Sequence, residues 1–257
     1  MADLLDVQGV GKTFGAPAEP VVAIRSVDLR VAQGEFVSIV GPSGCGKSTL
    51  LQIIAGLLPA STGDVHLEGR AVVAPPEGVV YLFQQYSRSL LPWLTVERNV
   101  SFGFSHLNGA SAREVEERCI HHLDMVGLAD FRKRYPWELS GGMQQRVAIA
   151  RALAAQPRVL LLDEPFSSVD ALTRLELHGL ILELWGKTGL TILLVTHDVE
   201  EAVYLSDRIV LLTRRPAQVA EVFANALPRP RRPVESREDP RFLGLRHELL
   251  TRLLKPE

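Results

Sequence analysis

A glycine-rich stretch with a single lysine has the residue types and the spacing best suited to chemistry. It is Gly41-Pro42-Ser43-Gly44-Cys45-Gly46-Lys47-Ser48-Thr49, the pattern G-x-x-x-x-G-K-S. Its glycines allow backbone conformations in which successive N–H groups point toward phosphate oxygens. Lys47 supplies a charge for the β- and γ-phosphates, Ser48 can ligate Mg²⁺ through its hydroxyl, and Thr49 can hold the α-phosphate. This phosphate loop therefore predicts binding of a nucleoside triphosphate.

Three polar residues end largely apolar runs farther along the chain and could complete the chemistry. Asp163 and Glu164 follow the run 159–162, and His197 follows the run 190–196. Asp163 has the placement required to hold Mg²⁺, and Glu164 can orient or deprotonate an attacking water. His197 can donate to the γ-phosphate or position the water. The alternatives are an N-cap pair before the next helix for the two carboxylates and a structural role for His197.

The other histidines and the two cysteines have no metal-binding pattern. His121 and His122 are adjacent, a spacing that does not place two ligands on one helix face. The remaining histidines are His66, His106, His178 and His247. Cys45 lies in the phosphate loop and Cys119 in a polar helical stretch, so no structural disulfide is expected, as is usual in the cytosol.

Predicted strands position the phosphate loop. It joins a predicted buried strand, 35–40, to a predicted helix, 50–55. Residues 4–40 are rich in alternating segments that predict an antiparallel sheet, with Phe14 in a connecting loop. Phe14 is either a partly buried turn aromatic or a platform on which adenine stacks.

Further strands are predicted before and after a helical region. The alternating segments 63–70 and 78–83 return the chain to the sheet, and Gln84 then lies at the end of a strand. The apolar runs that precede Glu164 and His197 predict buried parallel strands. The carboxyl ends of such strands are where open α/β sheets place ligands.

The composition between Gln85 and Leu139 is helical and predicts an insert, with helix candidates at 95–100 and 112–120. Within this insert, the apolar segment Ser89–Leu94 either packs onto the core or is exposed as an interface with a partner.

A second helix N-terminus suited to an anion is predicted at Ser140-Gly141-Gly142, with Ser140 as the candidate N-cap. Near the end of the chain, residues 227–239 are rich in proline and arginine and are predicted to be irregular. A terminal helix follows, and its apolar side carries Phe242, Leu245, Leu249, Leu250 and Leu253. This helix either packs on its own domain or forms a regulatory or dimer contact.

Length and composition limit the class of protein. The 257 residues are 46% hydrophobic and 23% charged, which suits one large α/β domain or a domain with a small appendage. The formal net charge of -2 does not favour binding to nucleic acid. The N-terminus lacks the basic region and long apolar run of a signal peptide. No stretch reaches the roughly 18 consecutive apolar residues of a membrane span.

The stretch Leu139-Ser140-Gly141-Gly142-Met143-Gln144-Gln145-Arg146, taken with the phosphate loop and Asp163-Glu164, resembles the ATP-binding subunit of ABC transporters. The likeness covers about 4–225, and the LSGG segment, residues 139–142, is specific to that superfamily. We expect an ABC ATPase domain over 1–257, with the helical insert at about 85–139 and an irregular segment and helix at about 227–257. The predicted fold class is α/β: a P-loop NTPase core with a mostly parallel sheet, an antiparallel β subdomain and a helical subdomain.

The resemblance implies a role for each site position. The catalytic set is Glu164, His197 and Gln84; the metal-binding set is Ser48, Gln84 and Asp163; the nucleotide-binding set is Phe14, Gly41, Pro42, Ser43, Gly44, Cys45, Gly46, Lys47, Ser48, Thr49, Ser140, Gly141, Gly142 and Asp170. In these roles Phe14 stacks adenine, Gln84 reaches Mg²⁺ and water, and His197 responds to the γ-phosphate. Asp170 matches the aspartate of the family's loop after the two carboxylates, although Ser168 and Val169 before it differ from the residues that the family usually has there.

In this family ATP is sandwiched between the phosphate loop of one subunit and the LSGG segment of another. The chain is therefore expected to pair with a second ATP-binding subunit, a copy of itself or a relative, and to use ATP and Mg²⁺. Likeness in Ser89–Val96, Tyr135–Leu139 and Asp163–Arg174 points to the importer branch for nitrate, sulfonate and taurine. That branch implies a membrane permease as partner, a solute-binding protein as an indirect partner, no nucleic acid, and a peripheral place at the cytoplasmic face of the cell membrane.

The alternative is a soluble ABC ATPase that is not coupled to transport and acts in DNA repair, translation or cluster assembly. Such proteins commonly carry two ATPase halves, a long coiled coil or a zinc insert, and this sequence has none of them. A P-loop kinase or a small GTPase has no use for the LSGG segment. An importer ATPase is therefore the leading interpretation.

Overall fold

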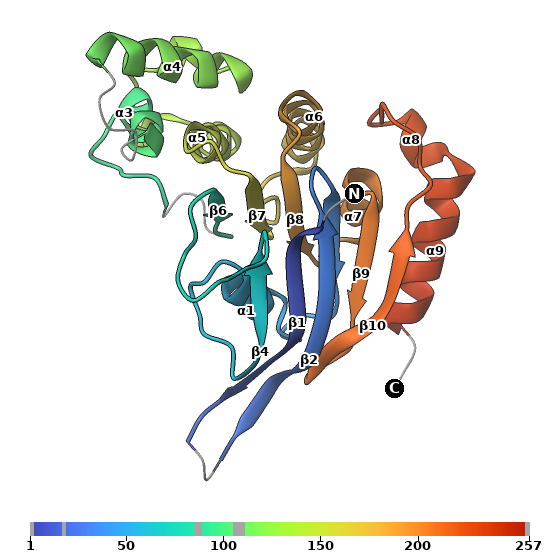
Figure 1. The fold of residues 1–257 in the computed structure, drawn as a ribbon. Helices are drawn as coiled ribbons and strands as arrows, with labels where there is room; N and C mark the ends of the chain where they lie inside the picture. The colour runs from blue at the N-terminus through green and yellow to red at the C-terminus, as the bar shows by residue number, and fades with distance from the viewer. Residues whose placement is uncertain (1–2, 17–18, 85–88, 105–110, 255–257) are drawn as a thin grey trace. The chain divides into compact units, whose positions relative to one another are not determined.

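The structure is a computed structural model that describes residues 3–16, 19–84, 89–104 and 111–254 (Figure 1). The chain divides into two compact units. Unit 1 comprises Met1–Pro76 and Gly189–Glu257, and unit 2 comprises Glu77–Thr188. Unit 1 is thus built from both ends of the chain, whereas unit 2 is continuous.

The strands of unit 1 form a sheet in the order β5-β4-β1-β2-β10-β9-β3-β8. They are β1 Asp3–Phe14, β2 Val21–Ala32, β3 Phe36–Val40, β4 Thr62–Leu67, β5 Arg70–Ala71, β8 Thr191–Thr196, β9 Arg208–Leu212 and β10 Ala217–Ala224. β1 pairs in antiparallel fashion with β2 and β4, which confirms the antiparallel sheet predicted for the N-terminal part. β3 pairs in parallel with β8 and β9, and all five of its residues are buried. Such an unbroken run is typical of a parallel strand that is covered on both faces.

Phe14 does not lie in a connecting loop, and that prediction was wrong. It is the last residue of β1 and pairs with Val21 on β2. β1 passes through several register shifts on the way, and these interrupt the simple alternation by which a strand is recognised in a sequence.

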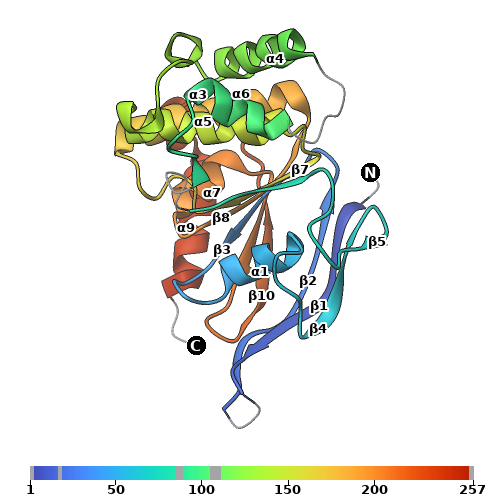
Figure 2. The same ribbon diagram turned by 90° about the vertical axis from the view of Figure 1, so that its left-hand side faces the viewer.

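The helices of unit 1 are α1 Lys47–Ile54, α7 Val199–Leu205, α8 Glu235–Glu238 and α9 Pro240–Leu254. α1 packs on β8, and α7 packs on β3, β8 and α9 (Figure 2). α9 buries Phe242 and Leu249, so the interpretation of the terminal helix as packed on its own domain is confirmed. Among the described residues, none of the helices has both the length and the apolar character needed to cross a bilayer.

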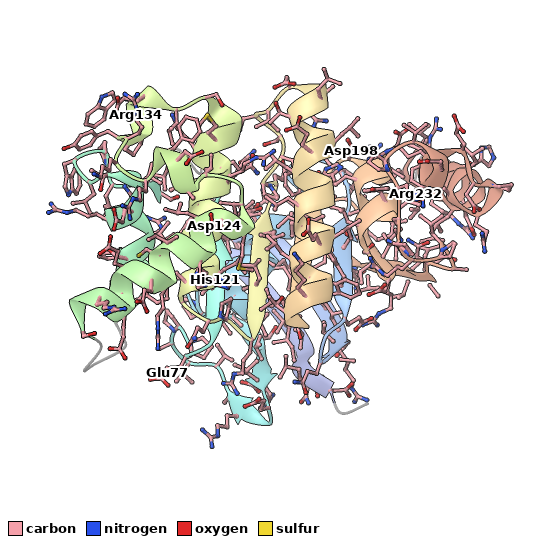
Figure 3. All side chains as sticks on the ribbon, turned by 90° about the horizontal axis from the view of Figure 1, so that it is seen from above. Glu77, His121, Asp124, Arg134, Asp198 and Arg232 are labelled. Atoms are coloured by element: carbon pink, nitrogen blue, oxygen red, sulfur yellow. The ribbon has the colours of Figure 1, made fainter. Side chains whose placement is uncertain are left out.

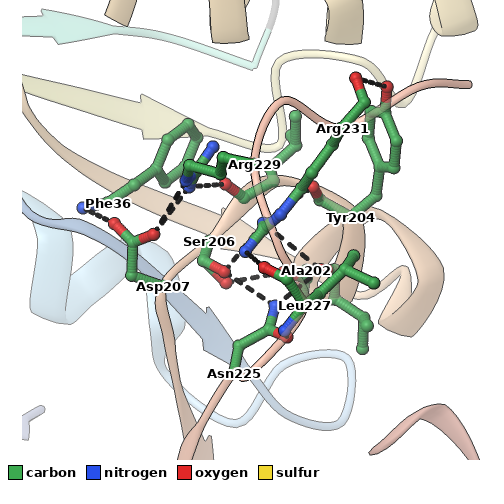
Figure 4. Close-up of polar contacts among 11 residues, drawn as sticks. Phe36, Ala202, Tyr204, Ser206, Asp207, Asn225, Leu227, Arg229 and Arg231 are labelled. Atoms are coloured by element: carbon green, nitrogen blue, oxygen red, sulfur yellow. Dashed lines mark hydrogen bonds and ion pairs between the residues drawn. The ribbon is translucent and has the colours of Figure 1, made fainter. Parts of the chain in front are cut away.

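A polar network fixes the segment after β10 to the end of α7 (Figure 4). The Arg231 guanidinium donates to the carbonyls of Tyr204 at 2.8 Å and Ser206 at 2.9 Å, and Asn225 also donates to Ser206, at 2.8 Å. The last carbonyls of a helix have no intrahelical donor, so these side chains cap α7. Burial lowers the pKa of Arg231 to about 10. The predicted irregular segment 227–239 contains only the short helix α8 and has defined hydrogen bonds.

Unit 2 combines two paired strands with helices. β6 Val79–Leu82 runs parallel to β7 Val159–Asp163. The helices are α3 Val96–Ser101, α4 Ala112–Met125, α5 Gly141–Ala154 and α6 Ala171–Thr188, with 3-10 turns at Phe102–Phe104, Ala129–Phe131 and Pro136–Glu138. α3, α4 and α5 pack on one another, and α5 also packs on α6 and β6. The helix candidates at 95–100 and 112–120 correspond to α3 and α4, while Gln85 and His106 lie outside the described residues.

One side of α4 faces the interior of unit 2. Cys119 and Leu123, four residues apart, are fully buried, whereas His121 and Asp124 are exposed (Figure 3). The sequence predicts that Cys119 lies in a polar helical stretch. Most of its neighbours along α4 are indeed polar, but the thiol itself is buried. Burial raises the pKa of Cys119 to about 11.

Candidate functional site

The phosphate loop of unit 1 has the geometry that its sequence predicts. It connects β3 to α1, with Gly44 at φ 73° and Gly46 at φ 122°, conformations that L side chains rarely adopt. Gly46 precedes the first residue of α1, so the loop delivers the chain directly into a helix N-terminus. Free N–H groups and the positive end of the helix dipole coincide there, which suits an anion.

Lys47 is the strongest indication of a phosphate ligand. Its side chain is buried, and its ammonium group donates to the carbonyls of Gly41 at 2.7 Å and Pro42 at 3.0 Å. Among the described residues no carboxylate forms an ion pair with it. A buried cation held only by neutral oxygens is poorly compensated, so an anionic phosphate placed on the loop would bind it favourably. Ser48 and Thr49 follow in the first turn of α1 and are partly exposed.

His197 and Phe14 are the other predicted site residues of unit 1. β8 runs parallel to β3, and His197 comes directly after it, at the sheet edge where the phosphate loop begins. The His197 side chain is exposed. Phe14 is 39% exposed at the end of β1, with the Lys12 ammonium 5.2 Å from its ring centre. An accessible ring of this kind can stack on a base, but stacking on adenine stays a prediction.

In unit 2, the structure brings the predicted metal and catalytic residues together at the end of β7. Asp163 is 6% exposed and accepts a hydrogen bond of 2.7 Å from the Tyr81 hydroxyl. The Gln84 amide donates to the Glu164 carboxylate at 3.3 Å. Gln84 follows β6, which runs beside β7, so parallel pairing explains how the two ends meet. Tyr81 is a residue that sequence reasoning missed, because nothing in the chain announces which strand pairs with β7.

Glu164 has an unusual backbone. Its φ is 44°, in the left-handed region that few residues other than glycine adopt. Its carbonyl accepts from the Ser167 hydroxyl at 2.9 Å and from the Ser167 N–H at 3.3 Å. Strain of this kind persists only where the surroundings fix it, and it occurs most often at functional positions.

The LSGG segment forms the N-terminus of α5. Ser140 is the N-cap, as predicted, and its hydroxyl accepts from the Met143 N–H at 3.3 Å. Gly141 is exposed, and a Cβ on Gly142 would collide with the methyl group of Thr173 on α6. The first N–H groups of α5 therefore remain available to an anion from outside the helix.

Asp170 begins α6. Its carboxylate accepts from the N–H groups of Leu172 and Thr173 at 3.1 Å each. Hydrogen bonds from Thr173 and from the backbone lower the pKa of this carboxyl. Asp170, and not Asp163 or Glu164, thus occupies the start of the following helix, so the N-cap alternative for that carboxylate pair is not supported.

Each unit by itself offers donors of the kind that a nucleoside triphosphate with Mg²⁺ requires. Within the described ranges, no group of three or more His, Cys, Asp and Glu residues could form a metal cage. Mg²⁺ does not require one, because it usually keeps several waters and takes one or two protein oxygens besides the phosphates. Ser48 in unit 1, and Asp163 and Gln84 in unit 2, offer oxygens of that kind.

Comparisons with known proteins agree with this chemistry. Residues 24–167 match the family model described as ABC transporter. The chain is 44% identical to the nitrate import ATP-binding protein NrtD of Synechococcus elongatus, over 94% of this chain and 88% of that protein. It is 42% identical to the aliphatic sulfonates import ATP-binding protein SsuB of Bacillus cereus, over 88% of each. The solved dimeric structure of the ATP-binding cassette MJ0796, in a post-hydrolysis state bound to ADP and Pi, is 34% identical with a TM-score of 0.75, over 86% of this chain and 98% of that one.

Proposed function

Because this chain belongs to the ABC transporter family, we propose that it is the ATP-hydrolysing subunit of an importer for a small anion or sulfonate-like solute. The chain is an ATP-binding ATPase. The contact between Gln84 and Glu164 carries the hydrolytic part of the proposal, since it sets an amide beside a carboxylate at a strand end. The similarity to nitrate and sulfonate import proteins supports the solute class.

Each residue of the site has a role in hydrolysis under this proposal. The phosphate loop holds the phosphates through its N–H groups, and Lys47 exchanges its two carbonyl acceptors for β- and γ-phosphate oxygens. Mg²⁺, when bound, would supply charge neutralisation; Ser48 of unit 1 would offer it a hydroxyl and Asp163 of unit 2 a carboxylate. Glu164 takes the proton of the attacking water, Gln84 orients that water, and His197 donates to the γ-phosphate.

The LSGG segment acts on a second subunit in this proposal. Ser140 and the N–H groups of Gly141 and Gly142 contact the γ-phosphate of the nucleotide that the partner's phosphate loop holds, which closes the site against water. The similar cassette MJ0796 is dimeric. We infer a dimer of two copies of this chain, in which each copy completes the site of the other.

The surface that meets the permease is the segment Ser89–Leu94. Trp93 is 69% exposed, whereas Leu90 is buried and anchors the segment. The buried Asn99 side chain accepts from the Leu91 N–H at 2.8 Å and donates to the carbonyls of Leu91 and Leu94 at 3.0 and 3.1 Å. The backbone is thus held so that the indole faces outward, an arrangement that favours an interface over packing on the core.

Reconstitution tests the proposal. The subunit is co-expressed with the product of a neighbouring permease gene, purified in detergent and placed in liposomes with the product of a neighbouring gene for a solute-binding protein. We expect copurification and ATP-dependent uptake of nitrate or an alkylsulfonate, with ATP hydrolysed at the cytoplasmic face. Failure to copurify with a permease, together with no ATP-dependent uptake into the liposomes, would instead support a soluble ABC ATPase that is not coupled to transport.

A further inference from the structure

Gln145 is a buried amide on α5 that the proposed chemistry does not use. It is fully buried, and its Nε2 donates to the carbonyl of Pro165. Its Oε1 is also buried and has no hydrogen-bond partner among the described residues. An unpaired buried polar atom is unfavourable, and an apolar residue would avoid that cost. The single hydrogen bond that its Nε2 donates therefore accounts for the presence of an amide at this buried position.

That bond holds the Pro165–Phe166 peptide, one residue beyond Glu164. A carbonyl can only accept, so the contact requires the NH₂ end of the Gln145 amide to face Pro165. On the other side, Ser167 donates twice to the Glu164 carbonyl. The left-handed turn at Glu164 is thus fixed from α5 by Gln145 and from its own loop by Ser167.

Two more contacts join α5 to α6. Gly142 lies against Thr173 in the first turn of α6, so closely that a Cβ would not fit. Arg146 pairs with Glu176 at 2.8 Å. Of these three contacts, the one made by Gln145 reaches the strained turn at Glu164, because the other two join α5 to α6.

We propose that Gln145 is a positioning residue for Glu164, which fixes the catalytic carboxylate to the helix whose N-terminus carries the LSGG segment. The inference rests on the proposed role of Glu164 as base. In each subunit, α5 contacts the partner's nucleotide at its first turn and holds the base for its own nucleotide three residues beyond Gly142. Engagement of the LSGG segment and placement of Glu164 then occur together. Loss of the bond leaves nucleotide binding and dimer closure intact but misplaces the base.

The test uses Gln145→Met, which keeps the side-chain length and removes the donor. We expect kcat to fall by about a hundredfold, the effect typical of a reacting group displaced by about 1 Å. KM for ATP should stay within about twofold, and the variant should accumulate an ATP-bound dimer. The matched control is Arg146→Met, which breaks the ion pair between α5 and α6 but leaves Pro165 held. It should keep near wild-type kcat.

A double-mutant cycle separates positioning from general damage. Gln145→Met in the Glu164→Gln background should cause little further loss in single-turnover hydrolysis, because the base is already absent. An equal loss in both backgrounds, a fall in ATP affinity, or wild-type kcat in Gln145→Met would overturn the inference. If Glu164→Gln itself hydrolyses ATP at the wild-type rate, the proposed function of Glu164 fails, and that result is distinct from a failure of Gln145 alone.

Discussion

Val40 and Thr196 are direct partners in the parallel pairing of β3 with β8. The next residues along the chain are Gly41, where the phosphate loop starts, and His197. One register therefore delivers a phosphate cradle and a proton donor to the same edge of the sheet, although 155 residues lie between Gly41 and His197 in the sequence. Neighbouring strand ends of this kind form the ligand sites of open α/β sheets.

Lys47→Ala should abolish most nucleotide binding. The change removes the cation from a site built for several phosphate charges, and charge-assisted hydrogen bonds are worth about 3 kcal/mol, or about a hundredfold in affinity. Calorimetric titration with Mg-ATP measures this directly. Lys187→Ala is the control, because Lys187 is exposed and paired with Glu183. Unchanged ATP affinity in Lys47→Ala would contradict the assigned role.

Glu164→Gln should bind Mg-ATP normally and hydrolyse it at least about a hundredfold more slowly, since the amide keeps the size of the side chain but cannot accept the proton. An ATP-bound dimer should accumulate on size-exclusion chromatography. Glu183→Gln, on an exposed face of α6, should behave like the wild type. Normal turnover of Glu164→Gln at saturating ATP rules out Glu164 as the base.

Tyr81→Phe should raise the Mg²⁺ concentration needed for half-maximal ATPase activity by about tenfold. The hydroxyl that donates to Asp163 orients a proposed metal ligand, and the loss of such a partner typically weakens metal binding by about 10- to 100-fold. The phenyl ring preserves the contact with Phe83. If the Mg²⁺ titration curves of Tyr81→Phe and the wild type superimpose, Asp163 does not need the hydrogen bond from the Tyr81 hydroxyl.

Trp93→Ala should fold normally and keep its basal ATPase activity, because the indole is largely exposed. Binding to the permease and the stimulation of hydrolysis by transported solute should both be lost. Pull-down with the permease and uptake into liposomes provide the measurements. Leu172→Ala, which truncates another exposed apolar residue, serves as the control. Undiminished transport in Trp93→Ala would move the coupling surface elsewhere.

Cys119 should make the free energy of unfolding depend on pH in the alkaline range. Burial raises the pKa of its thiol from 9.0 to about 11, and the carboxylates of Glu97 and Glu116 act in the same direction. The folded state therefore favours the protonated thiol, so this contribution is complete below about pH 9 and is lost as the pH rises to about 11. The difference between the wild type and Cys119→Ala should shrink by about 2 kcal/mol across that range in urea unfolding. A pH-independent difference would show that the thiol does not titrate in this way.

Local patterns account for what the sequence predicts well. The strand, glycine turn and helix around Lys47 are contiguous, and each is specified by its own residues, as is the N-cap at Ser140. Long-range pairing accounts for what it misses. The bond from Tyr81 to Asp163 depends on β6 lying beside β7, and the bond from Gln145 to Pro165 depends on how α5 packs. Neither contact produces a periodic pattern in the sequence. The motif that contains Gln145 identifies a family but does not show which group the amide binds.

The discontinuity of unit 1 also sets an order of events during synthesis. β3 is complete at Val40, but its neighbours β8 and β9 are both made after Gly189. Unit 2 ends at Thr188, so the ribosome has finished it before either neighbour of β3 exists. Domains fold largely as units while the chain emerges. The nascent chain therefore carries the complete unit 2, with its LSGG segment and carboxylate pair, while β3 still lacks both of its neighbours, and the sheet on either side of the phosphate loop forms only after β8 and β9 are made.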